Sequence, residues 1–100
     1  MGDKVAICVE KHLDGWRGHA NLYRLDPAIE YERWIWRRGK KKTLYVILST
    51  VTVPFDDGIE TLAFPAKKNG EPITFLEVGG IRGTSDHEKV LADMGYKLVV

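Results

Sequence analysis

Runs of β-branched and aromatic residues, separated by glycine and proline, dominate the chain. The clearest run, 43–53, is rich in Val, Ile, Thr and Tyr, and it predicts a strand at the centre of a sheet. In the run 4–13 apolar residues occupy both alternating faces, which predicts a strand covered on both sides. The run 19–25 predicts a further strand, joined to 4–13 by the glycine-containing turn at 14–18.

Proline and turn-forming residues are predicted to end several strands. Pro27, Pro54 and Pro65 each follow a β-rich run, and proline fixes φ and lacks the N–H donor that a sheet uses. Asn69-Gly70 predicts a tight turn because both residues tolerate positive φ. The remaining predicted strands span 28–36, 59–64, 73–78 and 96–100.

The run 28–36 fits two structures. As a helix it would stack Glu32 on Trp36 and place Ile29 near Arg33. Its density of aromatic and branched residues favours a strand instead, with a turn at Gly39 leading into the run 43–53.

The predicted helix lies near the end of the sequence. Ser85 and Glu88 have the spacing of a capping box, with Ser85 as the N-cap residue, and Gly95 fits a left-handed C-terminal cap. The glycines between 79 and 83 predict a flexible connection before this helix. Its apolar face is predicted to contain His87, Val90, Leu91 and Met94.

About six strands and one short helix predict a single α+β domain over 1–100, with a mostly antiparallel sheet and the helix on one face. A length of 100 residues suits one core, and 44% hydrophobic residues exclude wholesale disorder. No apolar run reaches the roughly 20 residues of a membrane span, and no secretory signal is recognisable. We therefore expect a cytoplasmic protein without a membrane partner. Cys8 is the only cysteine, so we expect no disulfide, no metal and no cofactor.

Charge is distributed unevenly. The whole chain has a net charge of +1, yet residues 33–42 contain six cations and no acidic residue, so the other ninety residues sum to −5. The sequence therefore predicts a mildly acidic body with one basic projection, which could attract a polyanion or an acidic protein surface.

Within this basic segment, indoles alternate with cations. Single-stranded nucleic acid is bound by such residues, because cations neutralise phosphates and indoles stack on bases. Trp and Arg are equally typical of protein interfaces, and a hairpin tip with lysines and core tryptophans needs no partner. The residues predicted to bind a partner here are Trp34, Trp36, Arg37, Arg38, Lys40, Lys41 and Lys42.

The turn at 14–18 and its flanks form a second candidate patch, because loops often contain functional residues. Trp16, Arg17 and His19 are its predicted partner-binding residues. Two weaker hypotheses remain. The histidines His12, His19 and His87 could act in acid–base catalysis with Asp14, Asp86 or Cys8, and the glycines at 79–83 could bind phosphate.

Several stretches resemble a family of small proteins encoded by phages of actinobacteria. The matching stretches are 15–27, 44–49, 60–66, 83–88 and 92–96, whereas the basic run 37–42 is not a feature of that family. The family has no assigned activity, cofactor or catalytic residue. The resemblance implies a phage accessory protein, made in the cytoplasm of a host bacterium, that binds a host protein.

Together these observations predict a non-enzymatic protein that binds and modulates a host protein. The alternative is a nucleic-acid-binding module that uses the hairpin 33–42, and the third hypothesis is a small catalytic or phosphate-binding domain. Either a monomer or a homodimer is expected, since an exposed edge strand could pair two copies.

Overall fold

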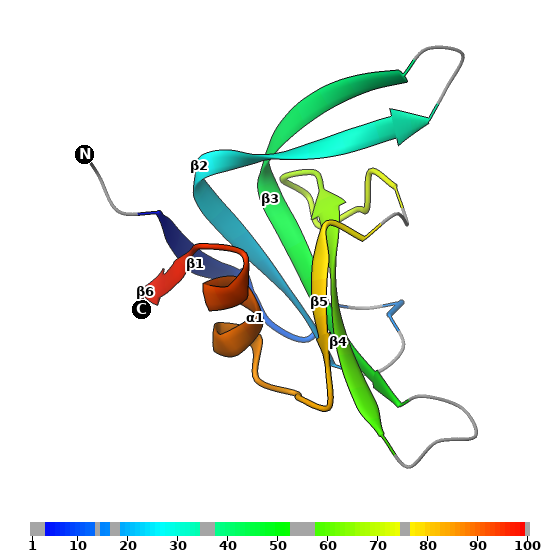
Figure 1. Ribbon diagram of the computed structural model, residues 1–100, viewed down its shortest axis with the longest axis vertical. Helices are drawn as coiled ribbons and strands as arrows, with labels where there is room; N and C mark the ends of the chain where they lie inside the picture. The colour runs from blue at the N-terminus through cyan, green and yellow to red at the C-terminus, as the bar shows by residue number, and fades with distance from the viewer. Residues whose placement is uncertain are drawn as a thin grey trace.

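The computed structural model describes residues 4–13, 15–16, 19–34, 38–52, 58–74 and 77–99, with only the main chain given at 32–34 and 38–40. These residues form six strands and one helix (Figure 1). The elements are β1 (Val5–Glu10), β2 (His19–Trp34), β3 (Arg38–Thr52), β4 (Ile59–Ala66), β5 (Gly79–Arg82), α1 (His87–Asp93) and β6 (Lys97–Val99).

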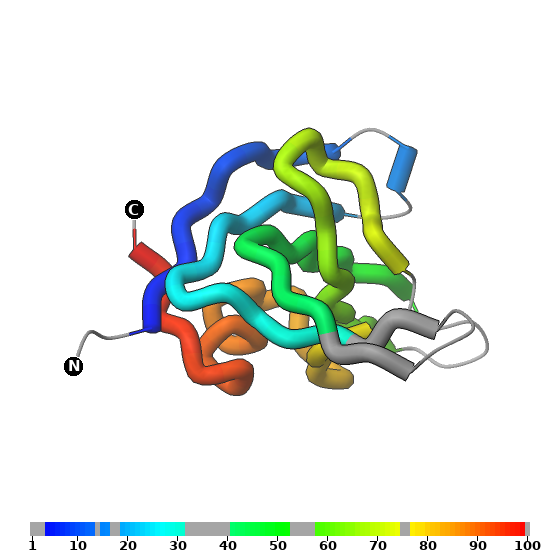
Figure 2. The backbone as a smooth tube through the Cα atoms, turned by 90° about the horizontal axis from the view of Figure 1, so that it is seen from above, coloured from blue at the N-terminus to red at the C-terminus, as the bar shows by residue number. Residues whose placement is uncertain are grey.

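The strands form one sheet in the order β5-β4-β3-β2-β1-β6. Neighbouring strands are antiparallel except β1 and β6, which are parallel. The α1 helix packs on one face of this sheet (Figures 1 and 2). The predicted α+β class, the mostly antiparallel sheet and the central position of the run 43–53 are therefore confirmed.

The main core lies between α1 and the sheet. Side chains from four neighbouring strands alternate onto this face and meet the apolar face of the helix, as its spacing predicts. The buried members are Ala6, Tyr23, Leu25, Val46, Leu48, Ala63, Val90, Leu91 and Tyr96.

A smaller cluster occupies the opposite face of the sheet. Leu22 and Ile47 are buried there, and the connection between β1 and β2 covers them with Leu13 and Trp16. A Cβ atom at Gly70 would lie 3.4 Å from the Leu13 side chain, so the turn after β4 also closes over this cluster. The central strands are thus covered on both faces.

Strand β1 differs from its prediction because only one of its faces is covered. Ala6 is fully buried against the helix side, whereas Ile7 and Val9 are 46% and 51% exposed. Only the short β6 separates β1 from the edge of the sheet, and the second cluster does not extend so far. The expectation of a strand covered on both sides is wrong.

Two prolines predicted to end strands lie inside them. Pro27 lies where the register between β2 and β3 shifts, between Arg24 and Ile29, so no regular ladder bond is lost. Pro65 pairs with Val46 and lies beyond the part of β4 that pairs with β5, so no neighbour needs its missing N–H. The third, Pro54, is outside the described residues.

Gly79 and Gly80, which were predicted to lie in a flexible connection, belong to β5. A Cβ atom at Gly79 would lie 2.9 Å from Met94, and one at Gly80 would lie 2.9 Å from the Thr61 carbonyl oxygen. The absent side chains therefore allow close packing against α1 and β4. The predicted strand at 73–78 is wrong, since its described residues lie outside the strands.

The helix ends are set by Asp86 and Gly95. Asp86, rather than the predicted Ser85, is the N-cap residue, and its carboxylate accepts hydrogen bonds from the amides of Glu88 and Lys89. Gly95 has a φ of +94°, which confirms the predicted left-handed C-terminal cap.

Candidate functional site

Strands β2 and β3 extend beyond the sheet as a two-stranded arm. Strand β1 pairs with β2 only as far as Asp26, and β4 pairs with β3 only as far as Tyr45. Past these points the segments 29–34 and 38–43 pair with each other, and among the described residues no third strand joins them. Figure 1 shows this β2–β3 arm projecting from the rest of the sheet.

The arm has a mixed but basic charge. Residues 29–43 contain six cations and two glutamates, a net charge of +4. The register places Glu30 opposite Lys42 and Glu32 opposite Lys40. Opposite charges at facing positions stabilise an antiparallel pair, so the acidic residues offset part of the basic character.

The described side chains of the arm divide into exposed and buried ones. Lys41 and Lys42 are both exposed, while Tyr31, which faces Lys41 across the two strands, is 9% exposed. Successive residues of a strand project to opposite faces, so the two lysines lie on opposite faces of the arm.

Several predicted binding residues lie partly or wholly outside the described residues. Arg17, Trp36 and Arg37 are outside them, and Trp34, Arg38 and Lys40 are placed by their main chain alone. The register places Trp34 opposite Arg38. The predicted turn at Gly39 is wrong, because Gly39 pairs with Arg33 within the two strands.

Trp16 and His19 are the described residues of the second predicted patch. His19 begins β2 and pairs with Thr50, so it sits at the opposite end of this strand from the arm. Trp16 is half-buried, with its ring centroid 5.5 Å from that of Phe64. The predicted binding residues therefore do not form one surface: His19 lies beside His87 on the α1 face of the sheet, whereas Trp16 covers the second cluster on the opposite face.

A chain of hydrogen-bonded polar side chains lies under the start of α1, which the sequence alone did not predict. His87 Nδ1 is 3.0 Å from Tyr23 Oη, and His87 Nε2 is 3.0 Å from Thr50 Oγ1. Thr50 Oγ1 is in turn 2.8 Å from Thr61 Oγ1. Asn21 Nδ2 donates to Tyr23 Oη over 3.2 Å. These five side chains, the polar chain, join β2, β3, β4 and α1.

The last acceptor of the polar chain determines the direction of its hydrogen bonds. Thr61 Oγ1 lies 2.7 Å from the carbonyl oxygen of Thr84, which can only accept, so the Thr61 hydroxyl donates to it. The Thr50 hydroxyl then donates to Thr61 and accepts from His87 Nε2–H. Asn21 Nδ2, an N–H donor, lies 3.5 Å from His87 Nδ1, which favours Nδ1 as the acceptor for the Tyr23 hydroxyl and hence a neutral imidazole.

The surroundings of His87 also favour the neutral form. Burial and, to a smaller extent, the neighbouring His19, whose ring centroid is 5.3 Å away, lower the pKa of His87 to about 4, although Asp86 acts in the opposite direction. Both ring nitrogens have hydrogen-bond partners within the fold, so His87 joins the start of α1 to β2 and β3.

The phosphate-binding hypothesis concerned the glycines before α1, and the sequence led us to expect no metal site. Among the described residues no group of three His, Cys, Asp or Glu side chains could hold a metal ion. Gly79 and Gly80 belong to strand β5. The amides of Glu88 and Lys89 donate hydrogen bonds to the Asp86 side chain, so they are not free to bind a phosphate.

The described part of the chain contains no helix with the length and apolar character needed to cross a membrane. Comparison with known proteins finds no matching family model, no similar curated protein and no similar solved structure. The fold and the arrangement of its side chains are therefore the basis for inferring a function.

Proposed function

We propose that this protein acts by binding another protein through the β2–β3 arm, without catalysing a reaction. The supporting observation is the arm itself, which extends past the last pairing with β1 and β4 and exposes Lys41 and Lys42. Ile29 packs against the main core and Tyr31 is buried, but the arm also offers exposed side chains and open main-chain edges to a partner.

The charge pattern of the arm favours a protein over a nucleic acid. Glu30 and Glu32 stand opposite two of the lysines, and carboxylates repel a phosphate backbone. Lys41 and Lys42 face opposite sides of the arm, so they do not line one track for phosphates. A protein surface with acidic patches suits this pattern, and the phage resemblance suggests a protein of the bacterial host.

A charge-reversal experiment tests this proposal. The tagged protein, its Lys41→Glu/Lys42→Glu variant and a Lys67→Glu/Lys68→Glu control are used to capture proteins from an actinobacterial lysate treated with nuclease. The control reverses an equally exposed lysine pair, in the turn after β4. We expect one stoichiometric protein to be captured by the wild type and the control, and lost with the arm variant.

The same capture can contradict the proposal in two ways. A partner that is lost equally from both variants responds to total charge rather than to the arm. A partner retained by the arm variant binds elsewhere on the molecule. Either result would remove the arm lysines from the function.

Nucleic-acid binding is the second candidate, favoured by the six cations of residues 33–42. If all six contact phosphates, the logarithm of the binding constant falls with the logarithm of salt concentration with a slope of about −4 to −5. Material captured only without nuclease, together with such a slope for an oligonucleotide, would replace the protein partner with nucleic acid. A slope near −1 would reject this second candidate.

A further inference from the structure

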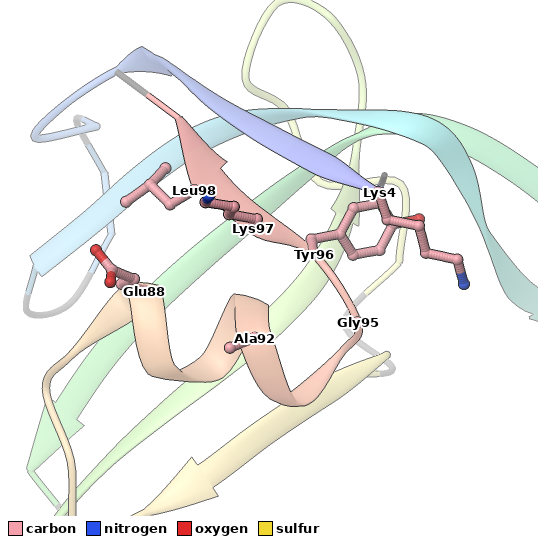
Figure 3. Close-up of a pocket in the computed structure, with 7 residues that line it drawn as sticks. All are labelled: Lys4, Glu88, Ala92, Gly95, Tyr96, Lys97 and Leu98. Carbon is pink, nitrogen blue, oxygen red and sulfur yellow. The ribbon is translucent and has the colours of Figure 1, made fainter. Parts of the chain in front are cut away.

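A groove of about 520 Å³ lies between α1 and β6, at the edge of the sheet away from the arm (Figure 3). Its walls are the helix flank that does not face the core and the side chains of β6. Ala92 and Leu98 supply apolar surface there. The residues that line it are Lys4, Glu88, Ala92, Gly95, Tyr96, Lys97 and Leu98.

The outer edge of β6 is open beside this groove. The strand order ends at β6, and among the described residues no strand pairs with its outer side. The Lys97 N–H donates to the Lys4 carbonyl on the β1 side over 2.8 Å. Because main-chain groups alternate in direction along a strand, the N–H and carbonyl of Leu98 face outward. An added strand would find two hydrogen-bonding groups at Leu98.

Charged side chains give the groove two different ends. Figure 3 shows Lys4 beyond Tyr96 at one end, Glu88 near Leu98 at the other, and Lys97 between them. Lys4 Nζ lies 5.9 Å from the centre of the Tyr96 ring, which keeps this ammonium group at its end of the groove.

We infer that the groove docks an extended segment of a partner protein, added to the sheet as a strand antiparallel to β6. Strand addition of this kind combines main-chain hydrogen bonds with pockets for alternate side chains. An apolar side chain opposite Leu98 points to the helix side and fills the groove between Leu98 and Ala92. An acidic side chain two residues later reaches Lys4, and a basic one two residues earlier reaches Glu88.

A short peptide of this chemistry tests the inference on the full chain. The probe is Lys-Thr-Val-Thr-Asp with a fluorescent label at its N-terminus and an amide at its C-terminus, and binding is followed by fluorescence anisotropy. One control peptide exchanges the terminal Lys and Asp, which preserves composition but reverses charge. A second is N-methylated at valine, which removes the hydrogen bond to Leu98 without changing charge.

Substitutions in the protein test whether the probe peptide binds in the groove. Ala92→Trp fills the groove from an exposed helix position, and we expect at least tenfold weaker binding. Lys4→Glu is expected to weaken binding about fivefold, because it replaces an attraction by a repulsion. Lys89→Glu is the matched control, since Lys89 is exposed on the same helix and does not line the groove. It should leave the affinity unchanged.

The expected result is binding of the probe that both control peptides and both groove variants weaken, with a shift of the Leu98 amide resonance. Equal binding of the charge-exchanged or N-methylated peptide would overturn the inference, as would no binding at millimolar concentration. The Lys41→Glu/Lys42→Glu variant should bind the probe normally, so failure at this groove and failure of the arm proposal are separate outcomes.

Discussion

Strands β2 and β3 run through both the body of the sheet and the β2–β3 arm, but these two regions are stabilised differently. In the body, Tyr23 and Leu48 are 3% and 0% exposed and contact side chains from α1 and neighbouring strands. In the arm, Lys41 and Lys42 are exposed and the strands pair with each other. The difference indicates that substitutions of buried body residues change stability, whereas substitutions of the exposed arm lysines change binding; Tyr31, which is buried in the arm, belongs with the first group.

The largest expected effect is the loss of a helix side chain in the main core. Leu91 is fully buried between α1 and the sheet, so Leu91→Ala removes apolar contacts and leaves a cavity. We expect the free energy of unfolding to fall by about 2–5 kcal/mol, measured by urea denaturation. Leu44→Ala is the control, because Leu44 is 41% exposed and the same change there should cost less than about 1 kcal/mol.

Equal losses for these two leucines would contradict the comparison. Such a result would mean that the segment of β3 next to the arm is as important for stability as the core under α1.

A smaller and pH-dependent effect is expected at His87, whose neutral form is favoured by burial and by the polar chain. The folded pKa is about 4 and the ordinary value is about 6.5, so between these values the unfolded protein binds more protons. The free energy of unfolding therefore falls as the pH drops from 6.5 to 4, by about 3 kcal/mol through this group alone. Above pH 6.5 the group adds no further pH dependence.

The variant His87→Gln tests this effect, because glutamine can still hydrogen-bond but does not titrate. Denaturation between pH 7 and 4 should show a shallower loss of stability in the variant than in the wild type. Parallel pH profiles for the wild type and His87→Gln would show that protonation of His87 is not coupled to unfolding.

The central strand of the sheet could be predicted from the sequence, but the ends of the strands could not. The β-branched run 43–53 gave the right central strand because burial on both faces leaves a continuous apolar pattern. The prolines were misleading, since Pro27 and Pro65 occupy positions where no ladder donor is needed. Whether a proline position needs an N–H donor depends on the register of the neighbouring strands, which local sequence does not specify.

The candidate sites depend still more on long-range contacts. Asn21 and His87 are 66 residues apart in the chain yet belong to one polar chain. The helical spacing of apolar residues identified His87 as a member of the buried helix face, but not its hydrogen-bond partners on β2 and β3. Likewise, the charge count predicted a basic projection. That Glu32 and Glu30 lie opposite Lys40 and Lys42 depends on the register of β2 and β3, which the charge count does not contain.

The smallest effect on stability is expected in the arm. Lys41→Ala/Lys42→Ala removes one facing charge pair, Glu30 with Lys42, and such pairs contribute about 0.2–1 kcal/mol. The free energy of unfolding should therefore change by less than about 1 kcal/mol. Association with the captured protein should nevertheless slow and depend less on salt, because the lysines attract the partner before contact.

Measuring stability and association on the same arm variant separates the two roles most directly. Unchanged association kinetics at low salt would remove the arm lysines from binding, even if a partner exists. A large loss of stability would mean instead that the arm unfolds together with the sheet, because only a cooperative unit would transmit a surface change to the core. Slower association in a protein of normal stability is the outcome that distinguishes a binding arm from an extension of the core.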